Sequence, residues 1–185
     1  MTDWDAKYSE EDDKSQWEPS LILTELISTL PAGMALDIAA GMGRNSFFLA
    51  EHGYHVDAVD FSDTAINKGK KMAQKKELPV TFTHVDLTSF PLPPESFDLI
   101  INFNYLERSL IPSMKGALKK NGAILFETFT IEQKEIGSPK NPDYLLAPNE
   151  LIDLFGDLHI TFYREGIFVE RGRKKAVATI VARKE

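Results

Sequence analysis

The stretch 35-ALDIAAGMGRNS-46 joins an apolar run to a glycine turn. The run ends in a carboxylate, Asp37, and Gly41 and Gly43 follow within six residues. Glycine allows the backbone to take up positive φ angles and to approach a ligand closely. The stretch therefore predicts a strand, a ligand-binding turn and the start of a helix, with a negative charge beside the turn.

Short apolar segments with strand character alternate with segments of helical periodicity on both sides of this stretch. The strand-like segments are 34–38, 55–59, 80–84, 97–103, 122–128, 158–164 and 176–183. The helical segments are 17–30, 44–52, 63–76, 108–120 and 148–155. This alternation predicts an α/β fold with a doubly wound, Rossmann-like sheet of seven strands, mostly parallel.

The end of the chain departs from the parallel pattern. The last two strand-like segments are joined only by residues 165–175, which are too few for a helical crossover. They are therefore expected to form an antiparallel C-terminal hairpin. No repeat or low-complexity linker divides the sequence, so residues 1–185 are expected to form a single domain.

The composition argues against several classes of function. The 185 residues carry 28 acidic and 21 basic side chains, and the net charge of −7 disfavours binding to nucleic acid. There is no cysteine, and the four histidines show no metal-ligand spacing, so no metal is predicted. The N-terminal segment is polar and acidic, unlike a signal peptide, and no apolar run reaches the ~20 residues of a membrane span. A cytoplasmic protein is expected; the sequence makes no prediction about oligomeric state.

Three predicted strands in succession end in a carboxylate: Asp37, Asp60 and Asp86. The carboxyl ends of parallel strands meet at one edge of an open sheet, where such sheets bind ligands. A single aspartate at such a place is more often a turn or cap residue. Asp57 competes for the role of Asp60, and Thr88 follows Asp86 at the spacing of a capped turn. Three carboxylates beside one glycine turn nevertheless favour a shared ligand.

Two kinds of cofactor fit a glycine turn of this type. The pattern Gly41-x-Gly43-x-x-Ser46 nearly matches the dinucleotide fingerprint, and Asp60 lies nineteen residues past Gly41, near the expected ribose-binding acid. However, a pyrophosphate at the helix N-terminus would be repelled by Asp37. A ligand without phosphate that carries an ammonium and a sulfonium would be attracted, and S-adenosylmethionine is such a ligand.

The segment 35-ALDIAAGMGRNSFFLAEHG-53 resembles the first motif of class I S-adenosylmethionine-dependent methyltransferases. Within that superfamily, the extension from Gly43 to Ser46 resembles the TehB-like (tellurite-resistance) branch, which acts on small molecules. The resemblance continues through 120-KNGAILFE-127 to the terminal hairpin, which matches the antiparallel seventh strand of that fold. Ala39 departs from the family because a glycine is usual there. A methyl group at that position narrows the turn without abolishing binding.

The resemblance implies S-adenosylmethionine as cofactor and S-adenosylhomocysteine as product. It implies that Asp37 holds the ammonium group, that Asp60 accepts hydrogen bonds from both ribose hydroxyls, and that Phe61 lies beside the adenine. Asp86 is expected to accept from the adenine amino group, and Phe103 to line the mouth through which the methyl group passes. The full cofactor-binding set is Asp37, Ala39, Gly41, Gly43, Asn45, Asp60, Phe61, Asp86, Leu87, Asn102 and Phe103.

The sequence predicts a small-molecule methyl acceptor and names no catalytic residue. Methyl transfer from this cofactor depends on holding the acceptor close and in line, so the absence of a recognisable base is no argument against it. The fourth strand ends in 102-NFNY-105 and lacks the N/D-P-P-Y/F signature of families that methylate exocyclic or amide nitrogens. The TehB-like resemblance suggests thiols or chalcogen oxyanions as acceptors.

Five residues are predicted to face the acceptor, and each has a structural alternative. They are Tyr8, Tyr105, Arg108, Asn141 and Tyr144. Asn141 and Tyr144 lie in the Pro-rich loop 129–148, which is expected to form a wall of the acceptor site or a rigid surface loop. Tyr8 belongs to residues 1–17, which are expected to form a lid over the cofactor or a frayed terminus. The structural alternatives are that Tyr105 packs on a helix and that Arg108 is a surface group.

Two other functions remain open at this point. An NAD(P)-dependent oxidoreductase with a Rossmann fold would need Asp37 turned away from the cofactor. A non-catalytic regulatory domain would bind S-adenosylmethionine and transfer nothing, and the sequence does not separate it from an enzyme.

Overall fold

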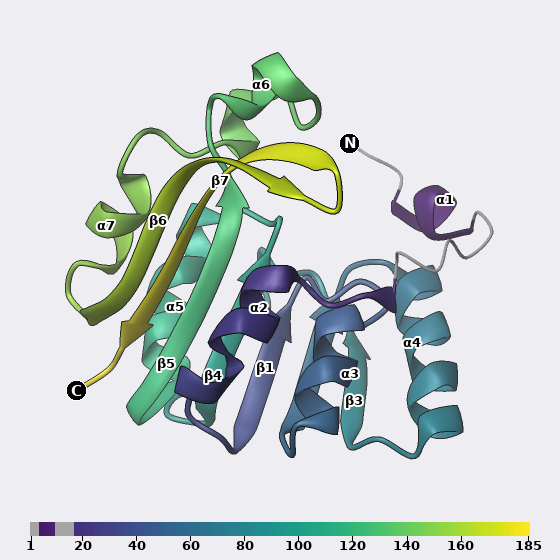
Figure 1. The fold of residues 1–185 in the computed structure, drawn as a ribbon. Helices are drawn as coiled ribbons and strands as arrows, with labels where there is room; N and C mark the ends of the chain where they lie inside the picture. The colour runs from purple at the N-terminus through teal and green to yellow at the C-terminus, as the bar shows by residue number, and fades with distance from the viewer. Residues whose placement is uncertain (1–3, 10–16) are drawn as a thin grey trace. The chain divides into compact units, whose positions relative to one another are not determined.

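The computed structural model describes residues 4–9 and 17–185 (Figure 1). By its internal contacts the chain divides into two compact units, Met1–Pro91 and Leu92–Glu185. The single domain expected over residues 1–185 stays a prediction, and each unit is described by itself.

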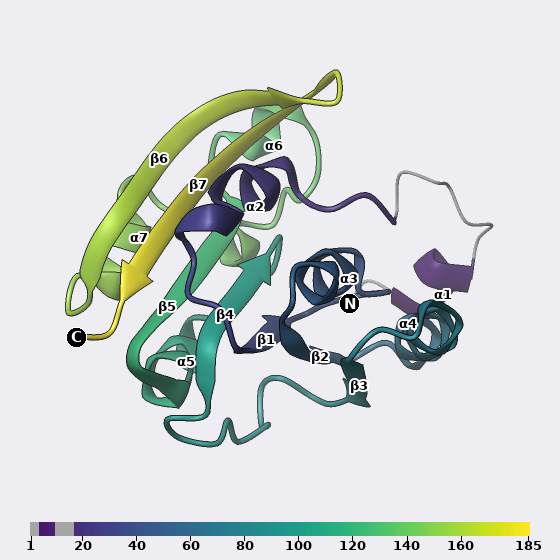
Figure 2. The ribbon, with the colours of Figure 1, turned by 60° about the horizontal axis from the view of Figure 1, so that its bottom comes forward.

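The first unit is a three-stranded parallel sheet in the order β3-β2-β1. Its elements are α1 (Trp4–Ser9), α2 (Leu21–Leu26), η2 (Ile27–Thr29), β1 (Met34–Ile38), α3 (Arg44–Glu51), β2 (His55–Asp60), α4 (Asp63–Lys76) and β3 (Val80–His84). Helices α3 and α4 follow β1 and β2 and pack side by side on the strands (Figure 2). Because the strands are parallel, their carboxyl ends and the starts of these two helices share one edge.

Helix α4 shows why the sequence folds locally as it does. The Ser62 side chain accepts a hydrogen bond from the Ala65 amide at 3.1 Å, which caps the helix start. Lys75 and Lys76 occupy the last turn, where positive charge complements the helix dipole. Ala65, Ile66, Gly69 and Ala73 form the buried face. The predicted helix over 63–76 is confirmed.

The helix expected over 17–30 is shorter than predicted. Helix α2 begins at Leu21, after Pro19 and Ser20, and ends at Leu26, where a 3₁₀ turn takes over. The hydroxyls of Thr24 and Thr29 donate to backbone carbonyls three residues earlier, at 2.7 Å in both cases. Such side-chain bonds compete with the regular helical pattern.

The second unit is a four-stranded mixed sheet in the order β4-β5-β7-β6. Its elements are β4 (Phe97–Phe103), η3 (Arg108–Leu110), α5 (Ile111–Ala117), β5 (Leu118–Phe129), α6 (Gln133–Ile136), η4 (Pro142–Tyr144), α7 (Glu150–Phe155), β6 (His159–Glu170) and β7 (Arg173–Arg183). Strands β4 and β5 are parallel, whereas β7 is antiparallel to both β5 and β6. The helix expected over 108–120 ends at Ala117, because Leu118 already pairs with Phe97 in the sheet.

The predicted C-terminal hairpin is confirmed and is longer than expected. Residues 165–170 continue β6 and residues 173–175 belong to β7, so only Arg171 and Gly172 form the turn. Both turn residues have positive φ angles, which suits a tight hairpin connection. The prediction of a mostly parallel, Rossmann-like arrangement of seven strands with an antiparallel end is therefore confirmed.

The core of the second unit lies along β4, β5 and β7. Ile100, Ile101 and Leu125 are fully buried, and the Phe126 ring packs against Phe155 of α7 with a centroid distance of 5.5 Å. Continuous apolar runs are typical of strands that are covered on both faces. In the described part of the chain, no helix has the length and apolar character that crossing a membrane requires.

Candidate functional site

The turn after β1 combines three residues with positive φ angles. Ala39, Gly41 and Gly43 have φ angles of 54°, 57° and 90°, and α3 begins at Arg44. The Gly43 amide donates to the Ala40 carbonyl at 3.0 Å, which closes the turn. A left-handed conformation costs an L-residue roughly 1 kcal/mol, so Ala39 is held there by the surrounding turn. The position where the family usually has its first glycine thus keeps the glycine-like conformation.

The two glycines of the turn serve different purposes. A Cβ atom at Gly43 would overlap the Phe82 ring, so this glycine is required for packing within the unit. A Cβ atom at Gly41 would lie 2.5 Å from the Tyr8 hydroxyl, so the bare backbone of Gly41 faces α1. The sequence predicted that the backbone approaches a ligand closely at both glycines. In the structure, only Gly41 is left to serve this purpose, because Gly43 is needed for packing.

Asp60, the last residue of β2, connects the glycine turn to the start of α4. Its Oδ2 accepts from the Gly41 amide at 2.7 Å, and its Oδ1 accepts from the Ser62 amide at 2.8 Å. Burial raises the pKa of Asp60, whereas the hydrogen bonds from the Ser62 and Gly41 amides oppose the rise. Two carboxylate oxygens have four lone pairs in total, so the Asp60 carboxylate keeps the capacity to accept a hydrogen bond from a ligand.

Asp37 is a buried carboxylate at the end of β1. Its side chain is only 1% exposed, and its Oδ2 accepts from the Ser46 hydroxyl at 2.6 Å. Burial raises the pKa of Asp37 to about 7, against the opposing effects of the Ser46 hydrogen bond and the Arg44 charge. Burying a carboxylate without a close cation is costly, and such groups are concentrated at functional sites.

Helix α1 lies against the glycine turn and the start of α4. The Asp5 carboxylate accepts from the Ser62 hydroxyl at 2.5 Å and from the Thr64 amide at 3.0 Å. Burial, followed by the negative charge of Asp60, raises the pKa of Tyr8 to about 12. Tyr8, predicted to face the acceptor, thus lies beside the cofactor residues. Of the expected lid over 1–17, residues 1–3 and 10–16 lie outside the described residues.

The residues assigned to the adenine lie at the ends of β2 and β3. The Phe61 ring is 56% exposed, and its backbone carbonyl accepts from His84 Nε2 at 2.7 Å. Asp86 Oδ1 accepts from the amide and the hydroxyl of Thr88, at 3.0 and 2.7 Å, and these bonds lower its pKa. Asp86 therefore caps the turn at Thr88, as the structural alternative in the sequence predicted. The roles of Asp86 and of the buried Leu87 at the adenine stay predictions.

Asn45 has a structural partner. It lies one residue into α3 and is buried, and its Oδ1 accepts from the Ser20 amide at 2.9 Å. This bond joins α3 to the start of α2. A direct contact of Asn45 with the cofactor stays a prediction.

In the second unit, the predicted residues lie at the end of β4. Asn102 is fully buried, its Nδ2 donates to the Tyr105 carbonyl at 2.8 Å, and its Oδ1 has no hydrogen-bond partner within the described residues. Phe103 is also buried. An unpaired buried acceptor is rare in proteins, and it is typical of a site that is completed by a water or a ligand.

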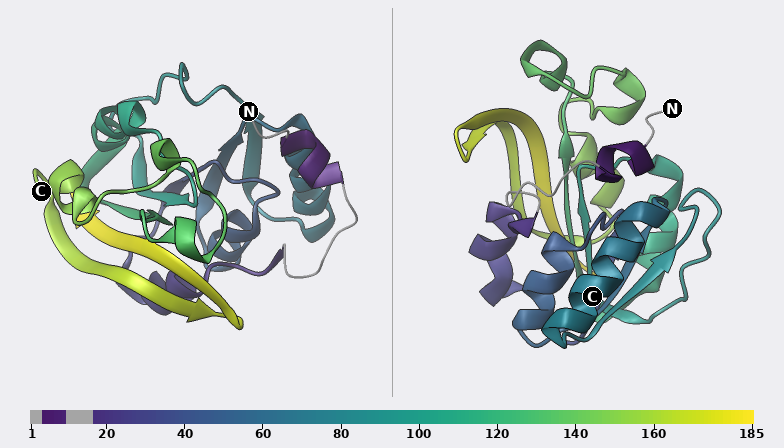
Figure 3. Two further views of the ribbon diagram at one scale, coloured as in Figure 1. Left: turned by 90° about the horizontal axis from the view of Figure 1, so that it is seen from above. Right: turned by 90° about the vertical axis from the view of Figure 1, so that its right-hand side faces the viewer.

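Arg108 supports the loop over residues 129–148. Its guanidinium donates to Glu150 at 2.5 and 3.0 Å, and to the carbonyls of Asp143 and Leu145 at 2.9 Å each. Asn141 Oδ1 accepts from the Asp143 amide at 3.1 Å and caps η4, whereas Tyr144 is exposed. A rigid surface loop was one of the two predicted alternatives, and the segment contains α6 and η4, with α7 beginning just after it (Figure 3). Contacts of these residues with an acceptor stay predictions.

Replacing Arg108 with methionine is expected to loosen this loop. Charge-assisted hydrogen bonds contribute about 1.5–3 kcal/mol each, so amide exchange at Leu145 and Leu146 should accelerate by tenfold or more. Hydrogen–deuterium exchange with peptide resolution measures the change. Lys140→Met, an exposed change on the same loop, is the matched control and should leave the exchange unaltered. Equal exchange in both variants would show that Arg108 does not hold the loop.

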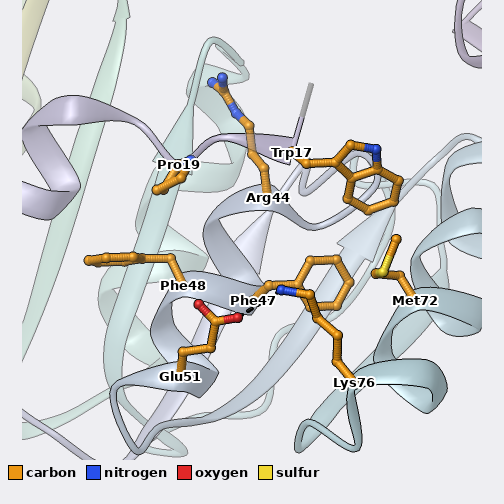
Figure 4. A pocket seen from close by; sticks show the side chains of 8 residues that line it. All are labelled: Trp17, Pro19, Arg44, Phe47, Phe48, Glu51, Met72 and Lys76. Carbon is orange, nitrogen blue, oxygen red and sulfur yellow. Dashed lines mark hydrogen bonds and ion pairs between the residues drawn. The ribbon is translucent and has the colours of Figure 1, made fainter. Parts of the chain in front are cut away.

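A small pocket lies on the outer side of α3 and α4 (Figure 4). It is lined by Trp17, Pro19, Arg44, Phe47, Phe48, Glu51, Met72 and Lys76, and its volume is about 100 Å³. Lys76 and Glu51 form an ion pair of 2.8 Å within it. No residue assigned to the cofactor lines this pocket, so it is distinct from the turn after β1.

Glu127 is a buried carboxylate that the sequence did not single out. It lies near the end of β5, directly opposite Phe103 of β4, and it is only 1% exposed. The signal was available, because Glu127 is the one charged residue in the apolar run 122-GAILFET-128. Its partners lie on β6 and β7, and no periodicity in the sequence indicates them.

Comparison with known proteins gives the family context. Residues 35–122 match the methyltransferase domain family. A demethylmenaquinone methyltransferase of Clavibacter sepedonicus is 32% identical over 114 residues, which are 58% of this chain and 45% of that protein. The probable S-adenosyl-L-methionine-dependent methyltransferase TehB of Haemophilus influenzae is 26% identical over 163 residues, 81% of this chain and 57% of that protein. The chain thus spans about half the length of the curated relatives it matches.

Solved structures show the same fold. The crystal structure of TehB from Haemophilus influenzae has a TM-score of 0.74 at 22% identity. The superposed region includes 98% of this chain and 66% of the TehB chain. A methyltransferase from Aquifex aeolicus also has a TM-score of 0.74, at 18% identity. The superposed region includes the whole of both chains. The predicted fold and the predicted resemblance to the TehB-like branch are confirmed.

Proposed function

We propose that the protein is an S-adenosylmethionine-dependent methyltransferase acting on a small molecule, a proposal supported by the match of residues 35–122 to the methyltransferase domain family. The observation that carries the proposal is the pair of buried carboxylates, Asp37 and Asp60, on either side of the glycine turn. A cationic ligand is attracted to this pair, and an adenosine diol matches the acceptor capacity of Asp60.

The same carboxylates argue against a nicotinamide dinucleotide. Asp60 suits the ribose of either cofactor, so Asp37 is the discriminating residue. A pyrophosphate placed at the start of α3 would lie close to the buried Asp37 carboxylate, and like charges repel strongly where the effective dielectric constant is low. An ammonium group at the same place would gain a counter-charge.

In the proposed reaction, a lone pair of the acceptor forms a bond to the methyl carbon while the carbon–sulfur bond breaks. When bound, S-adenosylmethionine supplies the electrophilic methyl group and leaves as the neutral thioether S-adenosylhomocysteine; a proton carried by the acceptor passes to solvent. The residues of this chain contribute binding and alignment, which is the main catalytic effect in such displacements. Asp37 would fix the amino-acid end of the cofactor, and Asp60 its ribose.

The acceptor class is supported by the relatives. Two of them are named as a demethylmenaquinone methyltransferase and a ubiquinone biosynthesis O-methyltransferase, which are small-molecule enzymes by name. The net charge of −7 supports the absence of nucleic-acid binding. A cytoplasmic location is part of the same proposal.

The test is the formation of S-adenosylhomocysteine, followed by mass spectrometry. The protein is incubated with S-adenosylmethionine and a panel of acceptors that covers thiols, hydroquinones and selenite. We expect S-adenosylhomocysteine to form faster than in the enzyme-free reaction with at least one acceptor. We expect this activity to be lost in the Asp60→Ala variant. Binding of the cofactor without any transfer would contradict an enzyme and favour the regulatory domain.

A further inference from the structure

Helix α1 lies beside the start of α4 and is fastened to it by one carboxylate (Figure 1). Asp5 Oδ1 accepts from the Ser62 hydroxyl at 2.5 Å and from the Thr64 amide at 3.0 Å. The Thr64 amide belongs to the first turn of α4, where backbone N–H groups have no partner within the helix. The negative charge of Asp5 also suits the positive end of the helix dipole. Because Ser62 caps the same helix from within, the Asp5 contact can be lost without unfolding α4.

The same face of α1 carries Tyr8. Residues three apart in a helix lie on one face, so Asp5 and Tyr8 point to the same side. The Tyr8 hydroxyl lies against the Gly41 backbone, only 2.5 Å from the place that a Cβ atom would take there. Asp60 joins the two contacts, because one of its oxygens accepts from the Gly41 amide and the other from the Ser62 amide. Helix α1 in this docked position therefore spans the cofactor turn from Gly41 to Ser62.

The Tyr8 side chain occupies space that a bound ligand needs. Gly41 is the position at which the bare backbone is free for close approach, and the Tyr8 hydroxyl fills the place of the missing side chain. Burial, followed by the charge of Asp60, raises the pKa of Tyr8 to about 12, against the opposing charge of Arg44. A ligand atom that touched Gly41 from this side would overlap the hydroxyl. Docked α1 and a bound cofactor therefore exclude each other.

We propose that α1 is an autoinhibitory segment: fastened through Asp5, it occupies the cofactor turn of the unliganded protein and has to leave before S-adenosylmethionine binds. The inference rests on the proposed function, because it takes this turn as the cofactor site. It differs from the lid that the sequence suggested, since a lid closes over a bound cofactor, whereas α1 takes the cofactor's place. The apparent affinity of a site that is open only part of the time falls in proportion to the open fraction. The strength of the Asp5 contact therefore sets how much cofactor the protein needs.

The test measures the association and dissociation rate constants of S-adenosylhomocysteine with the full chain by surface plasmon resonance. Asp5 is exposed, and contacts of exposed carboxylates are weak, so Asp5→Ala should accelerate association by roughly threefold. Dissociation starts with α1 already released and should change by less than about twofold. Tyr8→Ala removes the obstructing ring and should have the same effect. The matched control is Asp63→Ala, which removes an exposed acid paired with His84 from the same turn of α4 and should keep both constants near wild type.

Hydrogen–deuterium exchange on the same proteins reports on α1 itself. A helix of six residues is unstable by itself in water, so residues 4–9 exchange rapidly once they are released. Addition of S-adenosylhomocysteine to the wild type should therefore accelerate exchange in residues 4–9, because the ligand displaces α1. In Asp5→Ala the same residues should exchange faster even without ligand.

Two kinds of result overturn the proposal. Faster dissociation from Asp5→Ala, or slower exchange of residues 4–9 in the presence of the ligand, would mean that α1 closes over the cofactor instead of excluding it. Unchanged association with Asp5→Ala would mean that α1 does not obstruct the turn. Failure of the wild type and every variant to bind S-adenosylhomocysteine would refute the proposed function and the inference with it, whereas binding with unaltered rate constants refutes the inference alone.

Discussion

Replacing Asp60 with alanine is expected to weaken the binding of S-adenosylmethionine by more than 100-fold. Two ribose hydroxyls lose a charged acceptor, and hydrogen bonds to charged groups are worth about 1.5–3 kcal/mol each, whereas about 1.4 kcal/mol corresponds to a factor of ten. The amides of Gly41 and Ser62 also lose their acceptor, so the glycine turn becomes less ordered. Isothermal titration with S-adenosylhomocysteine, which is chemically stable, measures the effect.

The matched control for this variant is Asp57→Ala. Asp57 lies three residues earlier on the same strand, is partly buried and competed with Asp60 for the ribose role in the sequence. Its affinity for the cofactor should stay within twofold of wild type. Asp60→Asn should lie between wild type and alanine, because one of its two acceptor oxygens remains. Wild-type affinity in Asp60→Ala would remove the ribose assignment, and a loss confined to Asp57→Ala would transfer it.

Replacing Asp37 with asparagine is expected to stabilise the cofactor-free protein and to weaken cofactor binding. Burial raises the pKa of Asp37 from 3.8 to about 7, so the folded state prefers the protonated form. The corresponding stabilisation is complete below pH 3.8 and is lost as the pH rises through about 7. At pH 8 the wild type therefore carries an ionised buried carboxylate, whereas asparagine is neutral and can still accept from Ser46.

The measurement is thermal unfolding of both proteins from pH 5 to pH 8. A penalty on the order of 3 kcal/mol corresponds to roughly 6–12 °C in a protein of this size. Asp37→Asn should melt higher by several degrees at pH 8, and the difference should shrink towards pH 5. The cofactor should bind at least tenfold weaker to the variant at pH 8, since its ammonium group loses a counter-charge. A lower melting temperature at pH 8, or unchanged affinity, would contradict the assigned role of Asp37.

Strands and well-capped helices could be predicted because their signals are local. The run 97-FDLIINF-103 is apolar along nearly its whole length and forms the buried strand β4, and Ser62, directly before the predicted helix 63–76, caps α4. The lengths of β6 and β7 could not be predicted in the same way. The residues Glu165 to Glu170 pair with β7, and this pairing depends on a two-residue turn at Arg171 and Gly172. The charged residues around this turn lack the apolar alternation that would have predicted strands on both sides of it.

The candidate site was predictable where it follows from topology. Asp37 and Asp60 end adjacent parallel strands, so the sheet itself brings them to the glycine turn. Arg108 and Asn45 could not be judged from sequence, because their partners, Glu150 and Ser20, lie 42 and 25 residues away. Glu127 was missed for the same reason, since Thr179 lies 52 residues further along the chain.

The most direct test of the central claim is isothermal titration of one preparation with S-adenosylmethionine, S-adenosylhomocysteine and NADH at pH 8. The buried carboxylates Asp37 and Asp60 predict binding of the two adenosyl ligands and none of NADH. Binding of NADH alone would mean that Asp37 does not face the ligand, and would make the protein a nicotinamide-dependent oxidoreductase instead.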